Sequence, residues 1–469
     1  MDYRPARFPL PLLGALGLVA GLLIVGVIAA PRVVAFSPEP ESPHLPGMTQ
    51  ISITFSRAMD AASVESHLTI EPATPGSFAW QDRTLTFQPT QPWPEATSVT
   101  VKVSAGARST RLLPLLTSST WSFTISTSRI CYLWPAGGQA DLYFRSADGE
   151  DTVRLTQTAL GVYDYNLASN AATLIYAAER ADGGTDLHLL DLITGEDQLA
   201  FACPSGARCR APALSPDGRF LVFEQFDLEG GSAAGRVPGP TRVWAADLSQ
   251  ASSVFPIGAE DHVTSMPTWS PAGVLAYFDN TLRAIALVDL STAPTPTVLR
   301  YLPSDLGPIG SWSPDGAFLI FPEIVFPSGP APTEGSVQFY SHIFRAEAAS
   351  GEVVDLWRGG MGLVEDASPV YSPDGQWIAF TRKYLEQDRW TLGRQLWAMR
   401  ADGSGAHPLT DEPDFNHSAL AWSPDSGGLV YMRFDETNPT QASEIWLVGS
   451  DGEGARRLVV GGYLPRWIP

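Results

Sequence analysis

The chain has 469 residues, of which 44% are hydrophobic, and it carries 42 Gly, 40 Pro and a formal net charge of −20. This apolar content is typical of a folded protein and excludes a disordered chain. The acidity excludes nucleic acid as a partner, because a protein that binds nucleic acid needs a basic surface to neutralise phosphates.

The first predicted element is an apolar helix. Residues 8–30 contain no charged side chain, and a helix of this length spans roughly 34 Å, enough to cross a bilayer. Arg4 and Arg7 precede the run and only Arg32 follows closely, which places residues 1–7 in the cytoplasm by the positive-inside rule. We expect a single-pass signal anchor in the bacterial cytoplasmic membrane, with the bulk of the chain extracytoplasmic. A cleaved signal peptide is the alternative.

Two glycines of this run, Gly17 and Gly21, form a GxxxG step. Such a step lets two membrane helices pack closely. Because Gly is common in membrane helices, we hold a homodimer through this step only as a lesser expectation.

Residues 33–127 predict a β-domain. Five segments alternate apolar and polar residues, the pattern of half-buried strands, and they are 51–55, 68–70, 85–87, 99–103 and 121–125. Several short strands separated by turn residues predict a β-sandwich.

The same segment carries the motifs of a known family. They are Ile53-Thr-Phe-Ser56, Met59-Asp60, Ser63-Val64, Leu85-Thr-Phe-Gln-Pro89 and Ser122-Phe-Thr124. In these residues the segment resembles the bacterial Ig-like domain of surface-layer and cell-wall proteins. The resemblance implies a spacer or adhesion module, and no residue in it is a candidate site.

Residues 128–469 contain an internal repeat. In five of six copies Ser-Pro precedes a turn with Asp or Gly and an apolar strand, and in four of these an aromatic residue stands before the Ser. The copies are 166–176, 214–223, 269–277, 312–321, 371–380 and 422–431. The first blade, which begins at Ile130, lacks one of its four strands, and one extra strand at Tyr463 follows the last blade. We therefore expect an all-β propeller of about seven four-stranded blades, with six or eight left open, which the C-terminal strand closes.

The repeated Trp-Ser-Pro-Asp-Gly motif, as at Trp312 to Gly316, resembles that of TolB-like (WD-type) β-propellers. The resemblance implies the fold but not an activity, because this propeller hosts many roles. Propellers of this kind also cap prolyl oligopeptidase-type enzymes, which need a hydrolase domain with a Gly-x-Ser-x-Gly elbow. That motif does not occur, and the seven His have no ligand spacing. We therefore expect no enzyme, no cofactor and no metal site.

Three cysteines divide into two kinds. Cys203 and Cys209 enclose a short polar loop, which predicts a disulfide in an oxidising compartment. Cys131 lies in an apolar strand-like run and is expected to be a buried free thiol.

The connections between second and third strands are long in four blades, at 225–240, 323–340, 382–394 and 433–443. In a propeller these connections emerge on one face, and exposed aromatic and Arg residues in loops suit a binding surface. The candidate partner-binding residues are Phe226, Arg236, Phe326, Phe339, Tyr340, Tyr384, Arg389 and Trp390.

These features together predict a membrane-anchored, extracytoplasmic, non-catalytic scaffold that binds another envelope protein through its long-loop face. Binding of a cell-wall or extracellular glycan is the alternative. An enzyme with a site in the propeller channel is a further and weaker alternative.

Overall fold

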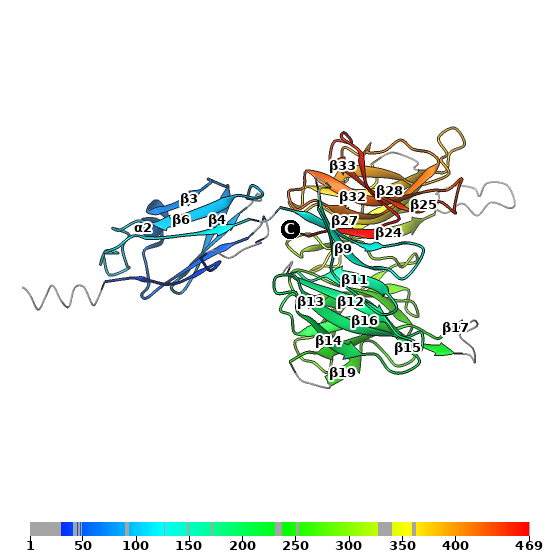
Figure 1. The fold of residues 1–469 in the computed structure, drawn as a ribbon, viewed down its shortest axis with the longest axis horizontal. Helices are drawn as coiled ribbons and strands as arrows, with labels where there is room; N and C mark the ends of the chain where they lie inside the picture. Colours follow the sequence, from blue (N-terminus) through cyan, green and yellow to red (C-terminus); the bar gives the residue numbers. More distant parts are fainter. Residues whose placement is uncertain are drawn as a thin grey trace, which may run out of the picture. The chain divides into compact units, whose positions relative to one another are not determined.

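The structure is a computed structural model that describes residues 30–40, 45, 47, 49–89, 93–125, 127–147, 149, 151–169, 172–229, 237–249, 253–326, 340–358 and 363–468. The chain divides into two compact units, residues 1–127 and 128–469. Both units are built from β-strands, which Figure 1 shows in sequence colours.

The first unit is a sandwich of two antiparallel sheets. One sheet has the order β1-β2-β5-β4 and the other β3-β6-β7. Asp60 caps the short helix α2 (Ala61–Ser66), because its carboxylate accepts the backbone N–H of Ser63 at 2.8 Å. The strands are β1 (Val33–Ser37), β2 (Ile51–Phe55), β3 (Leu68–Glu71), β4 (Gly76–Gln81), β5 (Thr84–Pro89), β6 (Ser98–Val103) and β7 (Ser119–Thr124).

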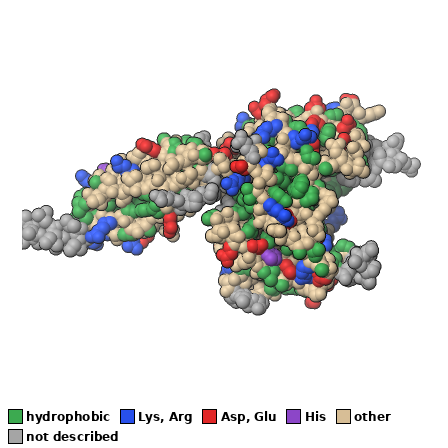
Figure 2. Space-filling model, viewed as in Figure 1, with side chains coloured by type: hydrophobic (Ala, Val, Ile, Leu, Met, Phe, Trp, Pro, Cys, Tyr) green, Lys and Arg blue, Asp and Glu red, His purple; other side chains and the backbone are tan. Residues whose placement is uncertain are grey.

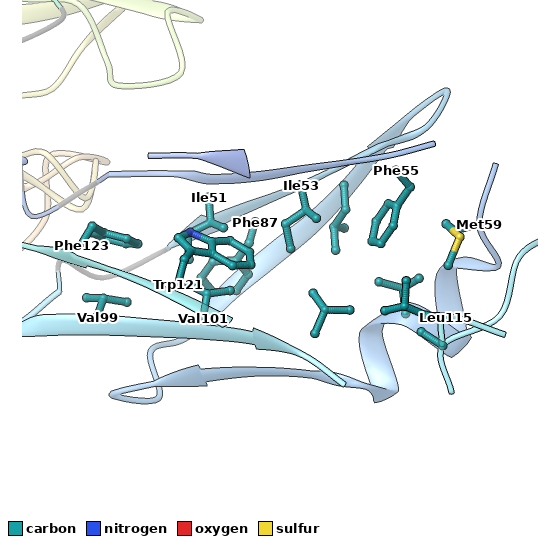
Figure 3. Packing of buried hydrophobic residues seen from close by; sticks show 14 of the residues in the cluster. Ile51, Ile53, Phe55, Met59, Phe87, Val99, Val101, Leu115, Trp121 and Phe123 are labelled. Atoms are coloured by element: carbon teal, nitrogen blue, oxygen red, sulfur yellow. The ribbon is translucent and has the colours of Figure 1, made fainter. Parts of the chain in front are cut away.

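The alternation in these strands decides which side chains fill the sandwich. Ile51, Ile53 and Phe55 of β2 are buried, whereas the residues between them are only half-buried. Figure 3 shows them packed against side chains of the other sheet, which are Val99, Val101, Trp121 and Phe123. The core therefore follows from the period of two that strands impose on their side chains.

The second unit is a β-propeller. Within the described residues it has seven successive blades. The first blade contains β35 (Tyr463–Ile468), β8 (Arg129–Trp134), β9 (Asp141–Ser146) and β10 (Thr152–Arg154), and the second contains β11 (Val162–Leu167), β12 (Thr173–Glu179), β13 (Thr185–Asp191) and β14 (Asp197–Ala202). The third blade contains β15 (Ala207–Leu214), β16 (Phe220–Glu229), β17 (Val237–Pro238), β18 (Arg242–Asp247) and β19 (Ser253–Pro256). The fourth contains β20 (Thr264–Trp269), β21 (Leu275–Asp279), β22 (Ala284–Asp289) and β23 (Thr297–Pro303).

The remaining three blades complete the ring. The fifth and sixth are joined by a single parallel bridge between Ser341 and Glu365. In the fifth, the innermost segment pairs with β24 through the bridge between Trp312 and Leu319 and through backbone hydrogen bonds to Ile320. The fifth blade contains β24 (Phe318–Val325), β25 (Tyr340–Glu347) and β26 (Val353–Asp355). The sixth contains β27 (Val364–Tyr371), β28 (Trp377–Tyr384), β29 (Gln395–Arg400) and β30 (His407–Pro408). The seventh contains β31 (Phe415–Trp422), β32 (Gly428–Asp435), β33 (Glu444–Gly449) and β34 (Arg456–Val460).

The C-terminal strand closes the propeller. β35 pairs antiparallel with β8, so the first blade has the order β10-β9-β8-β35 and takes one strand from the end of the chain. In Figure 1 this red strand lies beside the strands of the first blade. Closure of this kind leaves the inner edge of the first blade paired rather than free.

The repeated Ser-Pro-Asp-Gly motif forms the turn between the first two strands of a blade. The Ser215 hydroxyl donates to Asp217 Oδ1 at 2.5 Å and accepts the N–H of Phe220 at 2.8 Å. Asp217 Oδ1 also accepts the N–H of Arg219, and Gly218 adopts a φ of 73°. The same contacts recur at Ser313 and Asp315, Ser372 and Asp374, and Ser423 and Asp425. These carboxylates are engaged within their own turns.

The prediction of a transmembrane helix at residues 8–30, with the membrane location that depended on it, requires correction. Among the residues that the structure describes, no helix has the length and hydropathy needed to span a bilayer. Residues 8–29, including Gly17 and Gly21, lie outside the described residues. An uncharged apolar run indicates hydrophobicity, and that alone does not establish a spanning helix.

Candidate functional site

The predicted partner-binding residues do not all lie at the surface. Phe226 is only 5% exposed, because β16 extends further than predicted and the Arg210 guanidinium covers its ring at 5.1 Å from the centroid. Tyr340 is also buried, as the first residue of β25. Both belong to the packed interior of their blades. Arg236 and Phe339 lie outside the described residues.

Phe326 and Trp390, by contrast, are surface residues. Phe326 follows β24 and is 66% exposed, and Trp390 lies between β28 and β29 and is 51% exposed. Both belong to connections between the second and third strands of adjacent blades, so the topology brings them to the same face of the ring. Large aromatic side chains such as these are enriched in protein interfaces relative to the rest of the surface.

The connection from β28 to β29 is built around cation–ring contacts. The Arg389 guanidinium lies 3.5 Å from the centroid of the Tyr384 ring, and Lys383 Nζ lies 4.8 Å from that of Trp390. Arg389 also contacts Glu386 at 3.4 Å. Each cation–ring contact at such a site contributes about 0.5–1 kcal/mol, so the loop holds its aromatic side chains in place without burying them.

This hairpin is locally basic in an acidic chain. Residues 382–400 carry five basic side chains and two acidic ones, whereas the chain as a whole has a net charge of −20. On the face of the propeller shown in Figure 2, acidic and basic side chains are interspersed. A basic segment in such surroundings is a place where an anionic group of a partner would be attracted.

A cavity of about 450 Å³ lies between the fifth and sixth blades, beneath this loop. A volume of this size is within the range of sites for small ligands. The side chains that give it chemical character are Trp357, Arg358, Arg382, Tyr384, Arg389 and Trp397. The sequence singled out Tyr384 and Arg389 of these as candidate binding residues and did not single out the other four, because only the tertiary structure brings Trp357 and Arg358 of the fifth blade beside Arg382 and Trp397 of the sixth.

A buried ion pair forms part of the lining of the cavity. Arg382 of β28 donates from Nε and Nη2 to the two oxygens of Asp366 on β27, each at 2.7 Å. The two side chains are only 4% and 3% exposed. They are directly opposite in the register of the two strands, so the sheet itself aligns the guanidinium with the carboxylate.

Aromatic rings surround the Arg382 guanidinium. It lies 4.6 Å from the Trp357 ring, 4.8 Å from Trp397 and 4.9 Å from Phe380. Burial raises the pKa of Asp366, because the cost of desolvating its carboxylate exceeds the opposing attraction of Arg382. The pair therefore depends on its mutual contact in a place that water does not reach.

The wall of the cavity formed by Trp357 is itself held in place. The His342 ring stacks on Trp357, with centroids 5.1 Å apart and planes inclined by 19°. His342 Nδ1 contacts Asp355 Oδ2 at 2.9 Å, and Asp355 Oδ1 accepts the backbone N–H of Trp357. The orientation of this ring is thus set by contacts within the fifth blade.

Metal ligands and cysteines complete the inventory of reactive groups. In the described part of the chain, no group of three or more His, Cys, Asp or Glu side chains is placed to hold a metal ion. Cys203 and Cys209 are joined in a disulfide. Cys131 is a buried free thiol, and burial raises its pKa to about 12, which makes it unreactive at neutral pH.

Comparison with known proteins divides the chain as its fold does. Residues 27–125 match the bacterial Ig-like domain family. The chain has an Ig-like domain followed by a β-propeller, as the sequence predicted, and its similar solved structures include TolB proteins. TolB of Acinetobacter baumannii is similar in structure at 14% identity, with 86% of this chain and 83% of TolB aligned and a TM-score of 0.43.

Two relatives match the chain in sequence. An uncharacterized protein of Agrobacterium fabrum is 27% identical over 55% of this chain and 80% of its own length. Dipeptidyl-peptidase 5 of Porphyromonas gingivalis is 32% identical over 140 residues, which are 29% of this chain and 19% of the peptidase. The chain therefore spans less than a fifth of that relative.

The second of these relatives corrects the expectation that the chain is not an enzyme, because a peptidase is among the proteins it resembles. The expectation depended on a missing Gly-x-Ser-x-Gly motif and on scattered His. Those two observations test for one hydrolase domain and for one kind of metal site, and they do not bear on catalysis in general.

Proposed function

We propose that the propeller binds a peptide segment of a protein partner at a surface that we call the loop rim, formed by Phe326, Tyr384, Arg389 and Trp390. The observation that carries this proposal is the exposure of Phe326 and Trp390, together with the basic side chains that lie over the Trp390 and Tyr384 rings. Large aromatic and Arg side chains contribute most of the binding energy in protein interfaces. The cavity beneath the rim adds a concave surface where a side chain of the partner would be desolvated.

The relatives support peptide as the class of ligand. Dipeptidyl-peptidase 5 is named for its action on peptides, and it shares a segment of sequence with this chain. Peptide hydrolysis is accordingly the second candidate function. A fluorogenic dipeptide substrate, together with a covalent probe for serine hydrolases, would test it. Turnover or labelling by the purified chain would support this candidate. The absence of both signals would count against it.

A peptide array probed with the purified full-length chain tests the binding proposal. Trp390→Ala and Phe326→Ala should each weaken binding to the array hits by tenfold or more, since each removes an exposed aromatic contact. Ile193→Ala is a matched control, because Ile193 is similarly exposed but lies in the second blade. If both rim variants bind as the wild type does, the proposal is wrong.

A further inference from the structure

The cavity beneath the loop rim is lined in part by the Arg382–Asp366 ion pair, whose side chains are almost wholly buried. The volume of about 450 Å³ suits a terminal residue with its neighbour rather than an extended run.

The lining has an excess of positive charge. Three arginines, Arg358, Arg382 and Arg389, line the cavity with only two carboxylates, Asp366 and Glu386. Both carboxylate oxygens of Asp366 already accept a hydrogen bond from Arg382. Glu386 meets Arg389 at 3.4 Å, a long contact between half-exposed groups, and such pairs are weak.

The two outer arginines retain donors for a ligand. Arg389 uses one nitrogen for Glu386 and Arg358 uses one for the carbonyl of Asp402, at 3.2 Å. A guanidinium has five N–H donors in a planar fork, which matches the two oxygens of a carboxylate. The apolar surface beside them is formed by Trp357 and Trp397.

Resting on the proposed function, we propose that the cavity receives the C-terminus of the partner peptide. Its α-carboxylate would be bound by Arg389 and Arg358, and its last side chain, an apolar or aromatic one, would pack against Trp357 and Trp397. A free C-terminus supplies both features in one residue, a carboxylate and an adjoining side chain.

Titration calorimetry with synthetic peptides tests this inference. The best-binding sequences from a library with free C-termini would be made again as C-terminal amides, which have the same side chains and lack the charge. We expect the amides to bind at least tenfold more weakly. Arg389→Gln should weaken binding of the acid form by a similar factor and leave the amide form nearly unchanged, whereas Arg389→Lys should restore part of the loss.

Arg283→Gln is the matched control, since Arg283 is an exposed arginine of the fourth blade that pairs with Asp305. Equal binding of acid and amide peptides, or equal loss of both with Arg389→Gln, would overturn the C-terminus inference. In that case the proposed function still holds if Trp390→Ala and Phe326→Ala weaken binding, and it fails with the inference if they do not. The two proposals can thus be rejected separately.

Discussion

The sixth and seventh blades place an arginine at the same position and use it differently. Arg382 on β28 lies opposite Gln395 at the start of β29, and Arg433 on β32 lies opposite Glu444 at the start of β33. Each guanidinium stacks on the Trp two residues further along the third strand, at 4.8 Å for Trp397 and 3.8 Å for Trp446. The two positions differ in the carboxylates around them.

In the seventh blade the arginine belongs to a network. Arg433 contacts both Glu412 and Glu444, and Glu444 also accepts hydrogen bonds from Arg457 and from Trp446 Nε1. Glu412 in turn contacts His417 at 3.1 Å. In the sixth blade Arg382 has one carboxylate partner, Asp366, and a cavity borders it. The residues opposite the arginine differ on both neighbouring strands, Gln395 for Glu444 and Asp366 for His417, and these differences accompany the change from a network to a cavity.

The largest expected effect is the loss of Arg382. Arg382→Ala would leave the Asp366 carboxylate buried without a counter-charge, and removing one partner of a buried ion pair typically costs about 3–5 kcal/mol. Chemical denaturation should show a loss of unfolding free energy in that range. The double variant Arg382→Met with Asp366→Asn removes both charges and should cost clearly less. A double variant as unstable as the single one would show that packing, not charge, explains the loss.

Arg433→Ala should cost less, although Arg433 has more partners. Glu444 would keep Arg457 and Trp446, and Glu412 would keep His417, so neither carboxylate would lose all its hydrogen bonds. We expect a loss of about 1.5–3 kcal/mol, the range for hydrogen bonds to charged groups. The same denaturation measurement checks it. If Arg433→Ala lost more unfolding free energy than Arg382→Ala, the proposed difference between the two blades would be wrong.

The network of the seventh blade should also respond to acid. The contact with His417 and, to a lesser extent, the contact with Arg433 hold the pKa of Glu412 at about 2, below its ordinary value of 4.5. A lowered pKa contributes stability that is present above pH 4.5 and is lost as the pH falls toward 2. Wild type should therefore lose stability relative to Glu412→Gln between pH 5 and pH 3. Thermal denaturation of both proteins across that interval measures the difference, which should stay constant above pH 6.

The smallest expected effect separates binding from stability. Trp390→Ala should change the unfolding free energy by no more than about 1 kcal/mol, because it removes the contact with Lys383 and little buried surface. Denaturation of this variant, beside its peptide binding, provides the check. A loss above 1.5 kcal/mol would mean that Trp390 supports the hairpin through Lys383, and its loss of binding could not then be assigned to contact with the partner.

The sequence by itself determined the features that a few neighbouring residues encode. The alternation in 51–55 and its partners predicted the sandwich strands, and the family match supports their assignment. The Ser-Pro-Asp-Gly turn was readable because its contacts, as between Ser215 and Asp217, span only a few residues. The strand left over at Tyr463 predicted closure with the first blade, because a propeller must pair its last edge.

Only the tertiary structure decided which of the predicted loop residues are exposed. Phe226 lies within the second strand of its blade, where Arg210 from a neighbouring strand covers its ring, whereas Trp390 follows the second strand of its blade and is 51% exposed. The cavity joins Trp357, Arg382 and Trp397, which come from two blades and three separate segments. Burial and cavity shape depend on contacts between residues far apart in the chain, and no local pattern records those contacts.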